Sequence, residues 1–294
     1  MSKWSVHSGM ITTAIPKIQG RVWFMSTGPS LTRQVHAAMR EASGRAIVPR
    51  YRSLGAHEVI DKAADDVVTI ADHEAEAILA DHLARLLPEA AFVGEEAAHA
   101  DPALLDRLGQ SLCWIVDPLD GTNNFAAGKP PFGVLVALCD GGETIGGWIL
   151  DCLTGRFCHA WRGQGAYLDG DLLTARPSDE QKPVAAISLI FMDPAKREAI
   201  AAHIAPHYRL VDIPRCAAEQ YPRLALGEND VSIFERTLPW DHAAGVLLLN
   251  EAGGKAARMD ARPYRVDAWA EPGLLGASSP RLWDELAERM AALG

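Results

Sequence analysis

The segment WIVDPLDGTNNF, residues 114–125, constrains the fold of this chain most, because an apolar run stops there at an acid–proline pair. Pro118 fixes its own φ and biases Asp117 toward an extended backbone, which places this acid at the end of a strand. Asp120 follows in a turn, where Gly121 permits tight backbone geometry. The segment therefore predicts an apolar strand that delivers two carboxylates into a loop.

A short helix is predicted directly after this turn. Thr122 or Asn123 could begin it, and the free N–H groups of its first turn would attract an anion. An Asp turn that caps a helix explains a lone D-x-x-D-G-T fragment about equally well. Only the longer string is specific enough to favour a functional site.

The remaining pattern predicts a mixed α/β chain. Residues 65–72, DDVVTIAD, have a β-branched centre and precede a helical pattern that ends before Pro88. The runs VLVALC and ETIGGWIL flank Asp-Gly-Gly and predict a hairpin. Later, VAAISLIF predicts a strand, Asp193 caps a helix that starts at Pro194, and Ser279 caps the last helix. Because the first half is richer in hairpins, two interlocked halves are expected.

One domain is predicted from residue 30 to residue 294. Its first helix is expected from Leu31, and residues 1–29 show no clear period, so they are predicted to be an N-terminal extension, either disordered or an artefact of start-codon choice. No run approaches the ~20 apolar residues of a spanning helix, and the N-terminus lacks the apolar stretch of a signal peptide. A cytoplasmic protein is therefore expected.

Charge and cysteine usage narrow the possible partners. The formal net charge of -10 argues against nucleic acid as the main partner, because such binding rests on clustered Lys and Arg. Small molecules remain possible as substrates. The five cysteines form no C-x-x-C pair, and their odd number suits free thiols, most of them structural, in a reducing compartment.

Three further acids lie where strands end or helices begin. Glu95 follows Gly94 and a short apolar run. Asp72 and Asp241 each begin an apolar helical pattern, where Asp is an ordinary N-cap. A Glu-Glu pair such as Glu95-Glu96 is usually a solvated surface. Each acid therefore has a structural explanation when it is taken alone.

Taken together, these acids predict a cation site. None has an obvious Lys or Arg partner in the local sequence, and like charges gathered at strand ends repel unless a cation binds. Carboxylates with a backbone carbonyl and water suit Mg²⁺ or Mn²⁺, whereas zinc would require His or Cys. His242 is not expected as a ligand, because no second histidine stands at ligand spacing.

These motifs resemble those of the inositol monophosphatase family. They are GEE at 94–96, WIVDPLDGTNNF at 114–125 and WDHAAG at 240–245 followed by NEAGG, with DDVVTIAD and a G-x-G-A-Y-L-D-G stretch in the expected order. The resemblance covers roughly residues 31–290. It implies a layered α/β/α/β/α sugar-phosphatase fold of the α/β (α+β) class, a homodimer, and acids that converge where the two halves meet.

The resemblance also implies two or three Mg²⁺ ions, with Mn²⁺ as a possible substitute. One ion would be held by Glu95, Asp117 and the carbonyl group of Leu119. A second would be held by Asp117, Asp120 and Asp241, and these last two acids would also lie against the substrate. A third, weaker ion would lie near Glu95.

The reaction that the resemblance implies is Mg²⁺-dependent hydrolysis of a small phosphate monoester, such as inositol monophosphate. The N–H groups of Gly121 and Thr122 would receive the phosphate. Glu95 and the Thr122 hydroxyl would orient a metal-activated water, and Asp72 would support Thr122.

The chain departs from the family pattern around the substrate. Arg215-Cys216-Ala217-Ala218 stands where members usually carry Gly-Ser/Thr-Ala-Ala, so Arg215 is either a surface arginine or a grip for a second phosphate or a carboxylate. Glu235 is the nearest counterpart of the family glutamate that contacts substrate hydroxyls, with an offset of one residue. Lys62 is the nearest counterpart of a family lysine, also with an offset of one residue. Histidinol phosphate, a nucleoside 3',5'-bisphosphate and fructose 1,6-bisphosphate therefore remain alternative substrates, and a non-catalytic metal-binding protein is a further alternative.

Overall fold

The structure, a computed structural model, describes residues 20–55, 59–63 and 66–293. At 20–27, 59–63 and 66 it describes the backbone only. Within these ranges, none of the helices combines the length and the apolar character needed to cross a membrane.

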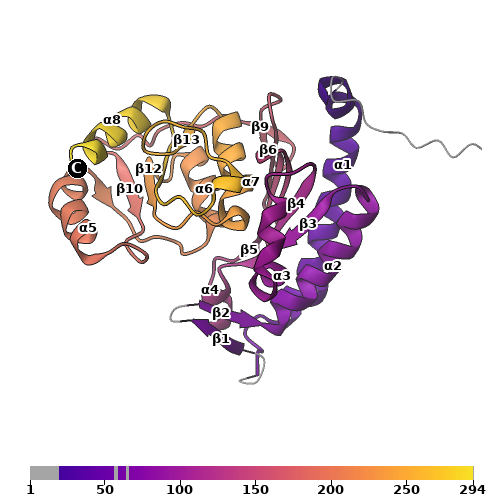
Figure 1. Cartoon of the computed structure of the whole chain (residues 1–294). Helices are drawn as coiled ribbons and strands as arrows, with labels where there is room; N and C mark the ends of the chain where they lie inside the picture. The colour runs from indigo at the N-terminus through magenta and orange to yellow at the C-terminus, as the bar shows by residue number, and fades with distance from the viewer. Residues whose placement is uncertain (1–19, 56–58, 64–65, 294) are drawn as a thin grey trace, which may run out of the picture.

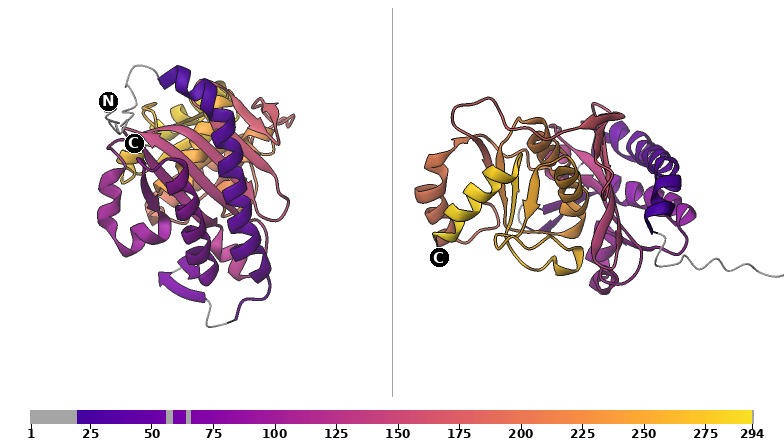
Figure 2. Two further views of the ribbon diagram at one scale, coloured as in Figure 1. Left: turned by 90° about the vertical axis from the view of Figure 1, so that its right-hand side faces the viewer. Right: turned by 90° about the horizontal axis from the view of Figure 1, so that it is seen from above.

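The described chain forms five layers, with helices and sheets alternating from one end of the molecule to the other (Figure 1). The expected α/β/α/β/α layering is confirmed. The first layer consists of two long helices, α1 (Gly20–Ala42) and α2 (Ile70–Leu86). The middle layer consists of α6 (Ala217–Leu226) and α7 (Pro239–Glu251), and the last layer of α5 (Pro194–Ala199) and α8 (Pro280–Ala291). Figure 2 shows the two outer helix layers at opposite ends of the molecule.

A seven-stranded sheet separates the first helix layer from the middle one. Its strand order is β3-β4-β5-β6-β7-β8-β9, and only β3 and β4 run parallel. The strands are β3 (Ala91–Gly94), β4 (Cys113–Asp120), β5 (Gly133–Asp140), β6 (Glu143–Asp151), β7 (Phe157–Trp161), β8 (Ala166–Leu168) and β9 (Asp171–Leu173).

A five-stranded sheet separates the middle helices from the last layer. Its order is β11-β10-β12-β14-β13; β10 runs parallel to β11 and β12, whereas β14 runs antiparallel to its neighbours. The strands are β10 (Val184–Ile187), β11 (Arg209–Leu210), β12 (Val231–Phe234), β13 (Lys255–Ala257) and β14 (Leu274–Ala277).

Smaller elements complete the described chain. Strands β1 and β2 form a separate antiparallel pair, and two short helices follow β3 and β4. These elements are β1 (Val59–Ala63), β2 (Asp66–Thr69), α3 (Glu95–Ala100) and α4 (Thr122–Ala126). Short 3-10 or π-helical turns lie at Ser43–Ile47, Val48–Arg50, Pro102–Arg107, Ile200–Ile204, Ala205–His207 and Val266–Ala268.

Apolar side chains fill each space between layers. Trp148 of the large sheet lies in a buried cluster with Leu79 of α2, and Leu135 on the opposite face lies in a second cluster with Leu249 of α7. Trp283 of α8 belongs to a third cluster, under the small sheet. Each sheet is therefore buried on both faces, which fixes the positions of the strand ends.

Several boundaries differ from the sequence expectations. The first helix begins at Gly20 instead of Leu31 and continues through Pro29, so part of the expected extension, 1–29, is helical; residues 1–19 lie outside the described part. The strand expected over VAAISLIF stops at Ile187. Strand β4 continues past Asp117, but its pairing with β5 is irregular up to Asp120, because a proline offers no N–H to the ladder.

Candidate active site

The predicted site residues come together at one pocket of about 190 Å³, where the ends of β4 and β12 meet the N-termini of α4, α6 and α7. Its lining includes Glu95, Asp117, Leu119, Asp120, Gly121, Thr122, Arg215, Glu235 and Asp241. Asp72 lies outside the pocket lining but contacts Thr122, which belongs to it. The side chain of Lys62 lies outside the described part of the chain.

Asp117 lies at the centre of the acidic cluster. Its side chain is 2% exposed, and its Oδ1 accepts a hydrogen bond of 3.0 Å from the N–H of Leu119. Burial, and then the negative charges of Glu95, Asp120 and Asp241, raise the pKa of this carboxyl well above its ordinary value. The acids therefore repel one another in the absence of a compensating cation.

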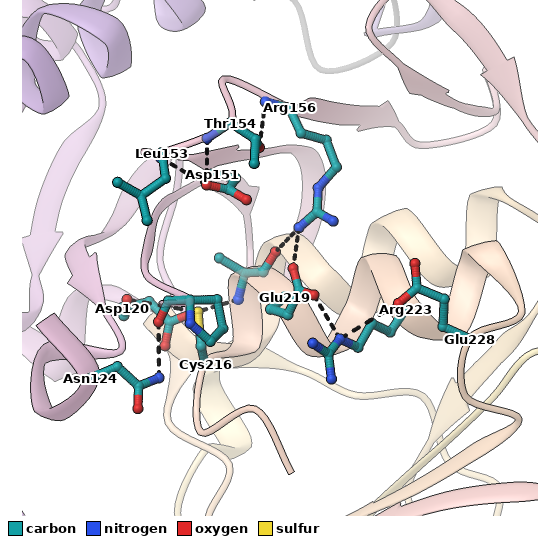
Figure 3. A network of polar contacts seen from close by, with 12 residues as sticks. Asp120, Asn124, Asp151, Leu153, Thr154, Arg156, Cys216, Glu219, Arg223 and Glu228 are labelled. Carbon is teal, nitrogen blue, oxygen red and sulfur yellow. Dashed lines mark hydrogen bonds and ion pairs between the residues drawn. The ribbon is translucent and has the colours of Figure 1, made fainter. Parts of the chain in front are cut away.

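Asp120 is held by the start of α6 (Figure 3). Its Oδ2 accepts hydrogen bonds from the N–H of Ala218 at 2.5 Å and from the thiol of Cys216 at 3.0 Å. Burial raises the pKa of Asp120, and these donors oppose the rise because they favour the carboxylate. Asp120 thus joins the large sheet to the middle helix layer.

An ion-pair network fixes the beginning of α6 in this position (Figure 3). Glu219, in the first turn of the helix, accepts hydrogen bonds from Arg156 at 2.5 Å and from Arg223 at 2.6 Å. Arg156 lies in the connection between β6 and β7 and also donates to the carbonyl group of Ala218, at 3.3 Å. The network therefore clamps the helix N-terminus against the large sheet, beside Asp120.

The turn after Asp120 is built as the sequence predicted. Gly121 has a φ of 83°, and α4 begins at Thr122. The Thr122 hydroxyl lies 3.1 Å from Oδ1 of Asp72 and 2.8 Å from the carbonyl oxygen of Leu119. The N-terminus of α4 thus borders the pocket, beside a hydroxyl that two oxygens orient.

Asp72 and Asp241 do not cap their helices, which corrects the sequence expectation. Thr69 is the N-cap of α2, and Asp72, three residues later, accepts hydrogen bonds from the Thr69 N–H at 2.8 Å and its hydroxyl at 2.6 Å. Helix α7 begins at Pro239 after Leu238, so Asp241 lies within its first turn. Both carboxylates can therefore face the site.

Glu95 is the first residue of α3 and lies at the pocket, as predicted. The carboxylate of Glu76 accepts the N–H groups of Glu96 and Ala97, each at 2.9 Å, and so fixes the start of this helix. A Cβ at Gly94 would overlap the Glu76 carboxylate, which explains the glycine of the GEE motif. Glu96 is buried, so the Glu95-Glu96 pair is not the solvated surface that was its alternative explanation.

Asp241 has an arginine partner that the local sequence did not suggest. Nη2 of Arg236 lies 3.9 Å from Oδ2 of Asp241, although no obvious Lys or Arg partner for this acid was identified in the local sequence. The Arg236 guanidinium also lies over the ring of Phe191, 4.1 Å from its centroid. Arg236 and Phe191 both line the pocket, and sequence reasoning identified neither of them.

His242, which the sequence did not favour as a metal ligand, has a partner within the protein for each ring nitrogen. Its Nδ1 lies 2.7 Å from the Tyr221 hydroxyl and its Nε2 lies 3.0 Å from the carbonyl oxygen of Arg236. Burial lowers the pKa of His242 to about 3. The neutral ring thus accepts from Tyr221 and donates to Arg236, so both nitrogens are used.

The donor chemistry of the pocket fits a hard divalent cation. The acids supply oxygen ligands and bring buried negative charge that such an ion would offset. As they stand, no three Asp, Glu, His or Cys side chains of the described ranges are gathered tightly enough to hold an ion. Glu95, Asp117, Asp120 and Asp241 nevertheless line the same pocket.

The cysteines are free thiols, as predicted. Four of them are buried, and Cys152 is partly buried. Cys216 differs from the others because its thiol contacts Asp120. Burial and the charge of Asp120 raise the pKa of this thiol well above its ordinary value, so it acts as a hydrogen-bond donor.

Comparison with known proteins gives consistent matches. The sequence profile of the inositol monophosphatase family matches residues 30–293. The Nus factor SuhB of Escherichia coli (strain K12) is 34% identical over 77% of this chain and 84% of its own length, and the inositol-1-monophosphatase of Bacillus subtilis (strain 168) is 28% identical over the same shares. The crystal structure of the extragenic suppressor protein suhB from Bartonella henselae shares the fold, with a TM-score of 0.75 and 24% identity over 89% of this chain and 98% of that one.

Proposed function

Since the chain belongs to the inositol monophosphatase family, we propose that it is a phosphoric monoester hydrolase that acts on inositol monophosphate or a related small metabolite, with Mg²⁺ as its cofactor. The observation that carries this proposal is the meeting of Glu95, Asp117, Asp120 and Asp241 at one pocket, beside the N-terminus of α4. Acids alone would repel a phosphate, so a cation is needed to bring the two together.

The proposed metal ligands follow the family pattern. Glu95, Asp117 and the carbonyl group of Leu119 would hold one Mg²⁺, and Asp117, Asp120 and Asp241 a second, with a third, weaker ion near Glu95. Mn²⁺ would be an acceptable substitute, because it also takes oxygen ligands. When bound, such ions neutralise phosphate charge and lower the pKa of a coordinated water.

The remaining roles belong to groups of this chain. The N–H groups of Gly121 and Thr122 would bind the phosphate, as helix N-termini do. Glu95 and the Thr122 hydroxyl would orient the attacking water, and Asp72 would hold that hydroxyl through its contact of 3.1 Å. Positioning of this kind supplies much of the rate in phosphoryl transfer. Glu235 and Arg215 are the proposed contacts to the rest of the substrate.

A substrate panel tests the proposal. Phosphate release would be measured from inositol 1-phosphate, histidinol phosphate, adenosine 3',5'-bisphosphate and fructose 1,6-bisphosphate, with and without Mg²⁺. We expect release from at least one ester with Mg²⁺ and only background without it. The cytoplasmic location and the homodimer remain proposals that fractionation and light scattering would test. Absence of release from every ester would contradict the proposed hydrolase.

A non-catalytic role is the second candidate, because relatives that are 34% identical bear the name Nus factor SuhB. A protein that keeps the fold and the acids but acts as a binding partner would still respond to Mg²⁺, because the ion binds the native state. Mg²⁺-dependent melting without phosphate release from any ester of the panel would favour this candidate.

A further inference from the structure

Glu235, a proposed substrate contact, is bound by a lysine from outside the pocket lining. Its Oε2 lies 2.6 Å from Nζ of Lys196. Glu235 lines the pocket, whereas Lys196, in α5, does not. We propose, on the basis of the hydrolase function proposed above, that Lys196 is a positioning residue for substrate recognition. It holds the Glu235 carboxylate so that this group accepts a hydrogen bond from a hydroxyl of inositol 1-phosphate or a similar polyol ester.

Backbone contacts fix both ends of this ion pair. Glu235 directly follows β12, and its carbonyl oxygen accepts a hydrogen bond of 3.0 Å from the N–H of Gly273. Asp193 is the N-cap of α5, and its Oδ1 accepts the N–H of Lys196 at 2.9 Å. The ion pair therefore joins two backbone segments that other hydrogen bonds already hold.

Helix α5 is also tied to the wall of the pocket. Arg197, the next residue after Lys196, donates to the carbonyl oxygens of Met192 and Ile190, each at 2.8 Å. Ile190 lines the pocket, as does its neighbour Phe191. The helix that carries Lys196 is thus anchored to the same wall that borders the substrate.

The ion pair leaves Glu235 able to bind a hydroxyl group. The side chains of Lys196 and Glu235 are 25% and 17% exposed, so water screens their attraction less than that of a surface pair. An ionised carboxylate has about four acceptor positions on its two oxygens, so a hydroxyl can bind beside the ammonium group. Lys196 also offsets a negative charge that would otherwise add to the charge of the acids in the same pocket.

The test compares two esters that share a cyclohexane ring: inositol 1-phosphate, and cyclohexyl phosphate, which has no hydroxyl groups. With Mg²⁺, we expect kcat/KM for inositol 1-phosphate to exceed that for cyclohexyl phosphate by about tenfold or more, because a hydrogen bond to a carboxylate is charge-assisted. Lys196→Met should lower this ratio by about fivefold or more, through a higher KM for inositol 1-phosphate, because remote binding energy is lost. Lys196→Arg should restore most of the ratio, since a guanidinium also donates to Glu235.

A double-mutant cycle shows whether Lys196 acts through Glu235. Glu235→Ala removes the carboxylate and should lower the ratio at least as much as Lys196→Met does. The double variant should then lower it no further than Glu235→Ala alone, because the lysine has lost the group that it positions. A lysine that only stabilised the fold would affect both esters alike and would leave the ratio unchanged.

Lys255→Met is the matched control. Lys255 is 29% exposed and lies 2.8 Å from Oδ1 of Asp284, so it forms an ion pair of the same kind as Lys196, but it lies outside the pocket lining. Its replacement should leave the substrate ratio unchanged. Melting temperatures show whether both methionine variants are folded. If Lys196→Met does not fold, Lys196→Gln, which keeps a polar side chain, takes its place.

The outcomes separate the two proposals. If the wild-type protein hydrolyses neither ester, nor any other ester of the panel above, the hydrolase function fails. If it hydrolyses another ester of the panel but not inositol 1-phosphate, or cyclohexyl phosphate as efficiently as inositol 1-phosphate, the hydrolase stands and the recognition of a polyol hydroxyl by Glu235 is wrong. A ratio that survives Lys196→Met, or losses from Lys196→Met and Glu235→Ala that add in the double variant, would overturn the role of Lys196.

Discussion

Replacement of Gly121 by alanine is predicted to cost more than backbone strain alone. A Cβ at this position would lie 2.9 Å from the carbonyl oxygen of Pro131 and 3.3 Å from Cβ of Cys216. The left-handed backbone costs an alanine about 1–2 kcal/mol, and overpacking typically adds about 1–3 kcal/mol. We therefore expect the free energy of unfolding to fall by about 2–5 kcal/mol. Phosphate release should fall as well, because the N–H groups proposed to bind phosphate would shift.

Gly155→Ala separates the two contributions. Gly155 has a φ of 77°, but a Cβ there would meet nothing within 4 Å. Its replacement should therefore cost only the backbone term, about 1–2 kcal/mol, and leave phosphate release unchanged. Urea unfolding of both variants, followed by fluorescence, measures the two free energies. Equal losses in Gly121→Ala and Gly155→Ala would refute the packing argument.

Three further variants test the surroundings of the site. In chelator at about pH 8, Asp117→Asn should melt at a higher temperature than wild type, and a lower calorimetric melting temperature for the variant would contradict this. Wild type itself should gain stability as pH falls toward the raised pKa of Asp117, because the folded state binds that proton more tightly than the unfolded state does. Arg156→Gln should lower both kcat and the melting temperature, since Glu219 loses a partner at the start of α6; unchanged kcat would show that the clamp does not position Asp120. Tyr221→Phe should lower the free energy of unfolding, measured in urea, by about 1–3 kcal/mol, because His242 loses its donor; no loss would contradict the assigned tautomer.

Local signals in the sequence predicted much of the fold. Asp193 and Ser279 cap α5 and α8 as expected, because Asp or Ser followed directly by proline is a specific signal for the start of a helix. Gly141 and Gly142 form the turn between β5 and β6, where both adopt positive φ. The layered arrangement came from the resemblance, since no local pattern states how two sheets stack.

The errors arose where tertiary contacts override local preference. Residues 1–29 were expected to form an extension because they show no clear period, yet α1 begins at Gly20 and passes through Pro29, and Gly28 packs close to Trp161 of the large sheet. The caps of α2 and α7 were misassigned because Asp is a good N-cap. For α2, the capping box formed by Thr69 and Asp72, three residues apart in the sequence, indicates Thr69 as the N-cap.

The acids of the site were predictable because each lies at a strand end or helix start within a motif. Arg236, which also lines the pocket, was not predictable from local sequence. Arg236 follows Glu235 directly, but its position depends on Phe191, which is distant in the chain and close in space. Cys216 was noticed only as a departure from the family pattern, because its contact with Asp120 joins two layers. Contacts between layers cannot be inferred from the spacing of residues along the chain.

The most direct test of the acidic site is the Mg²⁺ dependence of phosphate release by wild type and Asp120→Asn, which nearly preserves side-chain size. The assay would use inositol 1-phosphate, or whichever ester of the panel the wild-type protein hydrolyses fastest. Wild-type release should rise from background and saturate with Mg²⁺, whereas Asp120→Asn, folded by circular dichroism, should show no release at any Mg²⁺ concentration. Near-wild-type rates for Asp120→Asn at limiting Mg²⁺ would contradict the assignment of this pocket as a metal-dependent hydrolase site.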